Sequence, residues 1–218
     1  MMSEHETPAA PRGVRKLLIS GLFGGVAGFA ASAALLRFVG SDAVGGLDKS
    51  ATIAALVAVL YLVIGLMVAL GTANPALGAR ILNVEDADEL REQHKVLSLS
   101  GVSMVLWGVA LLALALAAPD GPLPQTIALA IAAGGLVVGT VLSMMVYRAS
   151  DELMLAVNLE GGALSYGLVF VLVGGWAMLA HLGYVAPPAP LDLLSAFYVL
   201  VLAASFIAVG RRGMLTVR

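Results

Sequence analysis

The sequence has no cysteine, few charged residues and few aromatic residues. Without a thiol, disulfide bonds, thiolate catalysis, iron–sulfur ligation and c-type haem attachment are all excluded. Charged residues make up 12% of the chain, about half of what a soluble domain carries, whereas hydrophobic residues make up 60%. The polar residues are too few to cover a water-soluble globule. A net charge of -2, with no basic cluster interleaved with aromatic side chains, also gives no basis for binding nucleic acid.

Long apolar stretches dominate the rest of the sequence. Each is long enough to cross the hydrocarbon core as a helix, which takes about 20 residues. Turn-forming Gly, Pro and Asp residues separate the stretches, which do not alternate as transmembrane β-strands do. The sequence therefore predicts an all-α, polytopic membrane helix bundle with six transmembrane helices arranged as three hairpins. The predicted spans are 17–39, 51–72, 96–118, 125–147, 155–182 and 191–210.

The basic residues predict the orientation of these spans. Of the 12 Lys and Arg residues, only Arg37 and Lys49 would lie on one side of the membrane. The other side would carry all the rest, which marks it as cytoplasmic. We therefore expect both termini in the cytoplasm. A composition rich in Ala, Gly and Arg but poor in Lys is typical of high-GC bacteria, so the predicted location is a bacterial inner membrane.

The N-terminal region allows two interpretations. Residues 1–13, which include Pro8 and Pro11, are expected to form a disordered cytoplasmic tail before a single transmembrane domain, 14–218. The small residues 31–33 after an apolar stretch also resemble a signal-peptide cleavage site. Because the apolar run continues to Val39 and the leader contains acidic residues, we interpret the first span as uncleaved.

Two segments of the chain resemble each other at an offset of 63 residues. Asp-Glu-Leu opens both, and Arg148 and Arg211 close them, so the units 88–148 and 151–211 would be tandem hairpins. The alternative explanation is that the shared residues are common to any helical hairpin and do not mark a repeat. Acidic residues are favoured at any helix N-terminus and basic residues at any C-terminus, because of the helix dipole.

Glu160 stands in an otherwise apolar run of the fifth predicted span, about nine residues along a helix that begins near Asp151. An ionised carboxylate facing lipid there would cost several kcal/mol, so it should face the bundle, be protonated or be paired. The offset of 63 residues relates Lys95 to Asn158, so we expect a Lys95–Glu160 contact. Glu160 would be either a structural ion pair or a group that titrates or contacts a transported solute. The residues predicted for such a polar path are Glu160, Asn158, Lys95, Tyr166 and His181.

The segment 83–95 is the most strongly charged part of the chain. At 100° per residue four of its five acidic residues share one helix face, which would form a cytoplasmic docking face together with charged residues of the next cytoplasmic loop. No His shares that face at metal-ligand spacing, so no metal site is expected. The residues predicted for the docking face are Glu85, Asp88, Glu89, Glu92, Arg148, Asp151 and Glu152.

Two functional hypotheses remain. The first is a non-enzymatic accessory, assembly or scaffold subunit that acts through helix packing and the docking face. Small residues at four-residue spacing, such as Gly135 and Gly139, favour it because they let helices approach closely. The second is a small transporter or channel, with Glu160 as its intramembrane polar site. No enzyme template fits and no cofactor is expected. The expected partners are the lipid bilayer and either a second copy or another membrane protein.

Overall fold

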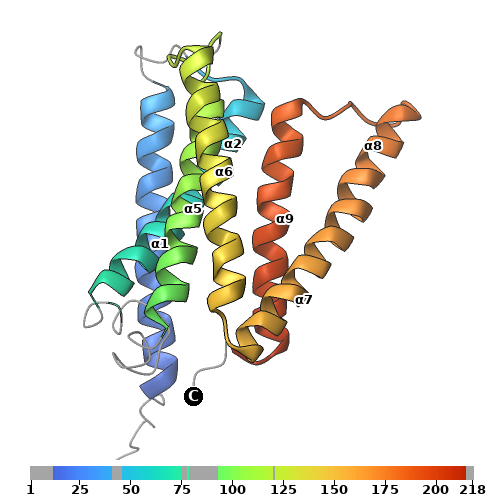
Figure 1. Ribbon diagram of the computed structural model, residues 1–218. Coiled ribbons are helices and arrows are strands. Elements are labelled where there is room, and N and C mark those ends of the chain that lie inside the picture. The colour runs from blue at the N-terminus through green and yellow to red at the C-terminus, as the bar shows by residue number, and fades with distance from the viewer. Residues whose placement is uncertain (1–11, 41–45, 75–77, 79–92, 120, 215–218) are drawn as a thin grey trace, which may run out of the picture.

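The computed structural model describes residues 12–40, 46–74, 78, 93–119 and 121–214, and only the backbone of 12–20 and 23. These ranges are almost entirely helical and contain no β-strand (Figure 1). The helices are α1 (Arg12–Val39), α2 (Lys49–Ala73), α5 (His94–Ala115), α6 (Gln125–Ala149), α7 (Glu152–Leu168), α8 (Gly174–His181) and α9 (Pro190–Arg211). A short π-helix, η1 (Val169–Val173), joins α7 to α8, so that the three run as one continuous rod.

Five of these elements are long and apolar enough to cross a membrane. They are α2, α5, α6, α9 and the rod Glu152–His181. Helix α1 spans Arg12–Val39, but the apolar segment found in it, Gly24–Val39, is shorter than the others. The prediction of an all-helical, multi-pass membrane protein is thus confirmed for five spans. The count of six and the arrangement as three hairpins stay predictions.

Aspartate side chains fix the starts of three helices. Asp48 Oδ1 accepts a hydrogen bond of 2.7 Å from the Ala51 N–H at the start of α2. Asp151 does the same for the Met154 N–H of α7, also at 2.7 Å. At α9, Asp192 Oδ2 accepts from the Ala189 N–H at 3.0 Å. Each carboxylate satisfies a backbone donor that the helix cannot satisfy itself and interacts favourably with the helix dipole.

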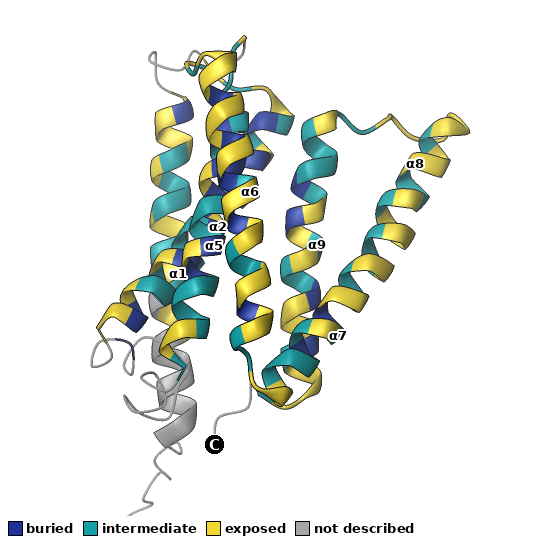
Figure 2. Cartoon of the chain, viewed as in Figure 1, coloured by how far each residue is buried: buried dark blue, intermediate teal, exposed yellow. Residues whose placement is uncertain are grey.

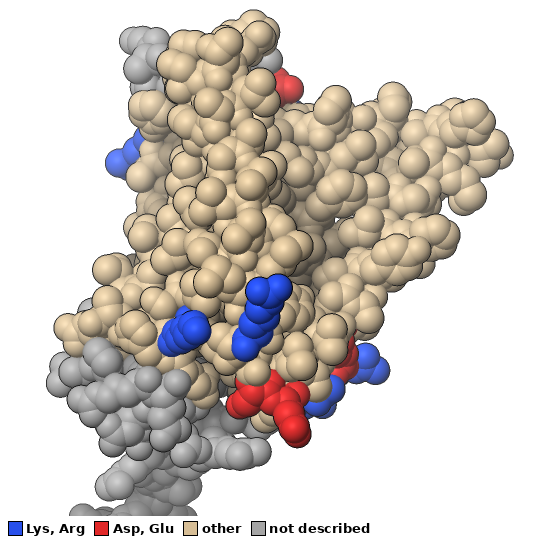
Figure 3. Space-filling view, in the orientation of Figure 1, with Lys and Arg blue, Asp and Glu red and all other residues tan. Residues whose placement is uncertain are grey.

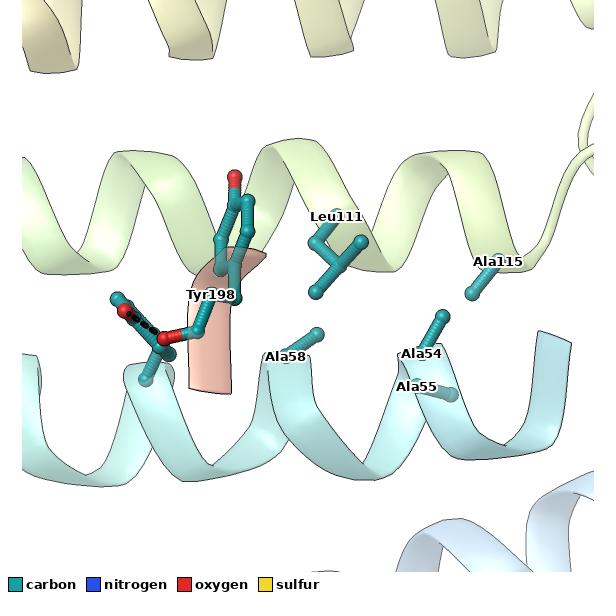
Figure 4. Packing of buried hydrophobic residues seen from close by; sticks show 7 residues of the cluster. Ala54, Ala55, Ala58, Leu111, Ala115 and Tyr198 are labelled. Carbon is teal, nitrogen blue, oxygen red and sulfur yellow. Dashed lines mark hydrogen bonds between the residues drawn. The ribbon is translucent and has the colours of Figure 1, made fainter. Parts of the chain in front are cut away.

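Helices α2 and α5 form the centre of the bundle through very small side chains. Figure 4 shows Leu111 of α5 facing Ala58 and its neighbours on α2. At Gly65 and Gly101 the backbones approach so closely that a Cβ on either glycine would lie 2.9 Å from a backbone atom of the other helix. Membrane helices associate through such close packing because lipid gives them no hydrophobic drive to do so.

The remaining helices surround this pair unequally. Helices α1 and α9 pack on α2, and α6 packs on α5. The rod α7–η1–α8, which we call the arm (Glu152–His181), packs mainly against α9 through α7 and diverges from it towards α8 (Figure 1). Only 6% of the arm's apolar window is buried, against 22–33% in the other four spans. The arm is therefore attached at its base and open along most of its length (Figure 2).

The described chain begins and ends at the same end of the bundle. The start of α1, the end of α6, the start of α7 and the end of α9 all lie there (Figure 1). The tandem-hairpin prediction is not tested by this arrangement. Helices α5 and α6 pack extensively, whereas the arm and α9 pack mainly at the base of the arm, so the two proposed units differ in packing.

Candidate functional site

Glu160 lies at the base of the arm, where α7 packs against α9. Its Oε2 accepts a hydrogen bond of 3.0 Å from Arg212 Nε, and its Oε1 lies 3.6 Å from Arg211 Nη1. The side chain of Glu160 is 26% exposed and that of Arg212 is 35% exposed. We call Glu160, Arg211 and Arg212 the Glu160 cluster. Two cations thus compensate one carboxylate, and all three side chains are partly exposed.

The predicted Lys95–Glu160 contact is wrong. In the described part of the chain, the ion pairs of Glu160 are with the arginines at the end of α9, and Lys95 is an exposed residue in the first turn of α5. The reason is that α7 packs against α9, the helix that follows the arm, and a Cβ added at Gly161 would be in van der Waals contact with it, 3.8 Å from the Cα of Ser205. In an antiparallel pair, a residue near the start of one helix meets the end of the other.

The pairing also places Glu160 near the end of the bundle. Helix α9 carries no charged side chain between Asp192 and Arg211, where it ends, so a side chain that reaches both arginines lies level with that end. An ion pair at this position avoids most of the cost of a charge in the hydrocarbon core. The interpretation of Glu160 as a structural pair therefore has a specific partner, although a different one from that predicted.

The other residues predicted for a polar path do not gather around Glu160. Asn158 is half-buried on the same helix, with no hydrogen bond between its side chain and another described residue. Tyr166 is exposed, and its ring stacks on Phe170 with centroids 6.4 Å apart. His181 ends α8, about 30 Å along the arm from Glu160 at 1.5 Å per residue.

The predicted docking face is described only in part. Glu85, Asp88, Glu89 and Glu92 lie outside the described residues. Arg148 is exposed at the end of α6, and Glu152 is exposed in the first turn of α7. Asp151 lies between them and caps α7. Acidic and basic side chains gather at this end of the visible face, below an uncharged middle (Figure 3).

A polar network in the middle of the bundle was not predicted from the sequence. The hydroxyl of Tyr61 on α2 donates to the Tyr198 carbonyl of α9 at 2.8 Å, and the hydroxyl of Tyr198 donates to the Trp107 carbonyl of α5 at 3.0 Å. The two tyrosine rings meet edge to face, with centroids 4.9 Å apart. A buried tyrosine hydroxyl usually has a hydrogen-bond partner, so a tyrosine in the middle of a predicted span could have indicated a hydrogen bond between helices.

A lateral groove opens where the arm diverges from α9. It has a volume of about 500 Å³ and is walled by the first turns of α2, by η1 and α8, and by the first half of α9. We call it the α8–α9 groove, defined by Lys49, Ile53, Trp176, Asp192, Ala196 and Val199. It lies at the end of the bundle opposite the Glu160 cluster. Sequence reasoning missed it because it depends on how two helices diverge.

Within the described ranges, no three His, Asp or Glu side chains lie together so as to hold a metal ion. The geometry therefore offers ion pairs, helix-packing surfaces and an apolar groove. Comparison of this chain with protein-family models, curated proteins and solved structures finds no match.

Proposed function

We propose that this chain is an accessory, assembly or scaffold subunit of a bacterial inner membrane. It would cross the membrane six times with both termini in the cytoplasm, and it would act without catalytic chemistry of its own. Its partner is a transmembrane helix of another membrane protein or of a second copy, packed on the arm.

The observation that carries this proposal is the open arm. The arm is a full-length span, yet only 6% of its apolar window is fully buried within the described chain. A Cβ added at Gly162, Gly167, Gly174 or Gly175 would meet no atom of the described residues within 4 Å, apart from its own stretch of helix. Glycine costs about 1 kcal/mol in a helix relative to alanine, so four unused glycines in one span weaken it without benefit to the isolated chain.

Glycines elsewhere in the bundle show what such positions are used for. At Gly135 a Cβ would lie 2.8 Å from the Leu106 carbonyl oxygen, and at Gly139 it would lie 2.8 Å from the ring of Trp107. There the missing side chain lets α6 contact α5. We infer that the arm glycines serve the same purpose against a helix from outside the chain.

The transporter hypothesis receives less support from the geometry. The carboxylate of Glu160 is engaged by two arginines at the base of the arm, and neither the α8–α9 groove nor a smaller cavity beside Tyr61 and Trp107 includes it. His181 and Tyr166 lie away from it. A path lined by the predicted residues would need a different arrangement of the arm.

Photo-crosslinking in the native membrane tests the scaffold proposal. A photoreactive amino acid is placed at Gly167 or Gly174 of the arm, and at Gly134 of α6 as the matched control, since a Cβ at Gly134 also meets nothing within 4 Å. We expect the arm positions to give a crosslinked protein product of one defined, larger mass, and Gly134 to give no such product. Its mass distinguishes a second copy from another protein.

A substitution completes this test. Gly174→Leu should abolish the crosslink formed from Gly167 and leave the thermal stability of the purified chain unchanged or slightly raised, because the position is open and leucine favours helix. Gly134→Leu should change neither. Crosslinks to lipid alone from all three positions would contradict the proposal.

A further inference from the structure

The α8–α9 groove has a polar mouth and an apolar floor. Lys49 is the first residue of α2 and Asp192 lies in the first turn of α9, so both are at the same end of the groove. From there the lining continues for eight residues along each helix, to Val57 and Leu200, a depth of about 12 Å.

The two charges at the mouth are not paired with each other. Lys49 is exposed and forms no ion pair with any described residue. Asp192 uses Oδ2 to cap α9 through the Ala189 N–H, and Oδ1 has no hydrogen bond to another described residue. One wall of the mouth thus offers an ammonium group to a ligand, and the other wall offers a carboxylate oxygen.

The third wall carries an aromatic side chain fixed in place. The Trp176 indole N–H donates to the Ala186 carbonyl at 3.0 Å, which ties the arm to the segment that follows α8. Tryptophan is enriched at the level of lipid headgroups. The mouth of the groove therefore has the features of a membrane interface, whereas its floor, with Ile53 and Val199, suits hydrocarbon.

We propose that the α8–α9 groove binds one zwitterionic phospholipid with a primary ammonium group, phosphatidylethanolamine, from the leaflet on that side. Lys49 binds its phosphate, Asp192 binds its ammonium group, and the upper part of an acyl chain lies on the apolar floor. An apolar partner helix would leave both charges unmatched. This inference does not depend on the scaffold role.

Lipid binding to the purified full-length chain, measured by native mass spectrometry, tests the charge pattern. Delipidated protein is titrated with phosphatidylethanolamine and, separately, with phosphatidylglycerol, which has the phosphate but no ammonium group. Lys49→Gln should weaken binding of both lipids by about fivefold, the upper end of the range for an exposed ion pair. Asp192→Asn, whose amide oxygen still caps α9, should weaken only phosphatidylethanolamine. Equal affinity of the wild type and both variants for each lipid would overturn the proposal.

A blocking substitution tests the place of binding. Ala196→Trp fills the groove and should abolish binding of phosphatidylethanolamine, whereas Ala133→Trp, on an exposed face of α6, should leave it unchanged. If Ala196→Trp leaves lipid binding intact and instead breaks up an oligomer or a crosslinked complex, the groove holds a protein helix and the lipid proposal is wrong. Loss of the Gly167 crosslink alone would bear on the scaffold role and not on this site.

Discussion

At the scale of single residues, a charge near the membrane is tolerated only where the fold compensates it. Glu160 meets Arg211 and Arg212 because α9 ends beside the base of the arm. The sequence indicated that Glu160 needed a partner, because an unpaired carboxylate in an apolar span is costly. The predicted partner, Lys95, was wrong because the 63-residue offset was taken to place Lys95 and Asn158 at the same depth. The arginines that pair with Glu160 lie instead at the end of α9, the helix that follows the arm.

The new pairing predicts an energetic coupling between Glu160 and Arg212. In a double-mutant cycle with Glu160→Gln and Arg212→Gln, we expect a coupling of up to about 1 kcal/mol, since both side chains are partly exposed. The measurement is unfolding of the purified chain in denaturant. Lys95→Gln is the control and should add to Glu160→Gln without coupling. A larger coupling to Lys95 than to Arg212 would refute this ion pair.

Glycines are used in two ways, and substitution by alanine should separate them. Gly65→Ala places a Cβ 2.9 Å from the Gly101 carbonyl oxygen and the Val105 nitrogen, so α2 and α5 must move apart. We expect a loss of about 1–3 kcal/mol in the free energy of unfolding. Gly134→Ala, at an open position of α6, should be neutral or slightly stabilising. Comparable losses at the two sites would mean that the helices are not in close contact.

At the scale of helices, the hydrogen bonds of two tyrosines link α9 to the central pair. Tyr198→Phe removes the bond to the Trp107 carbonyl, and we expect it to cost about 1 kcal/mol, as interhelical hydrogen bonds in membranes do. Tyr166→Phe is the matched control, because that exposed tyrosine makes no hydrogen bond with another described residue. Thermal unfolding in detergent measures both. The same loss in the control would show that the Tyr198 bond contributes nothing specific.

Span positions could be predicted well from the sequence, and helix packing could not. Apolar runs bounded by Asp48, Pro124 and Asp151 mark the starts of α2, α6 and α7 closely, because the length of hydrocarbon to be crossed and the capping of helix ends are both local requirements. Packing between helices gives no such signal. In a membrane the lipid-facing side of a helix is as apolar as the packed side, so the hydrophobic pattern does not distinguish them.

The arm illustrates this limit. The sequence predicted one continuous span over 155–182, and the rod Glu152–His181 agrees. Its π-helical turn at Val169–Val173 and its divergence from α9 were not predicted: the doublets Gly161-Gly162 and Gly174-Gly175 would permit a kink in this helix, but they do not determine its direction. The α8–α9 groove follows from that divergence. Neither Lys49 nor Asp192 suggested a binding site until the fold placed them on opposite walls.

At the scale of the whole molecule, the orientation of the bundle decides which side of the membrane the docking face and the lipid site face. The Glu160 cluster, Arg148 and the two ends of the described chain lie together at one end, and the mouth of the α8–α9 groove lies at the other. Because basic residues are in excess at the first end, we predict that this end faces the cytoplasm. This orientation would place the docking face in the cytoplasm and the lipid site in the opposite leaflet.

The most direct test is thiol labelling of single-cysteine variants in intact cells. The chain has no native cysteine, so each label reports one position. A membrane-impermeant reagent should label Pro122→Cys and Tyr184→Cys from outside the inner membrane, and it should label Lys95→Cys and Glu152→Cys only after that membrane is permeabilised. Labelling of Lys95→Cys and Glu152→Cys in intact cells, with Pro122→Cys and Tyr184→Cys protected, would contradict the proposed orientation.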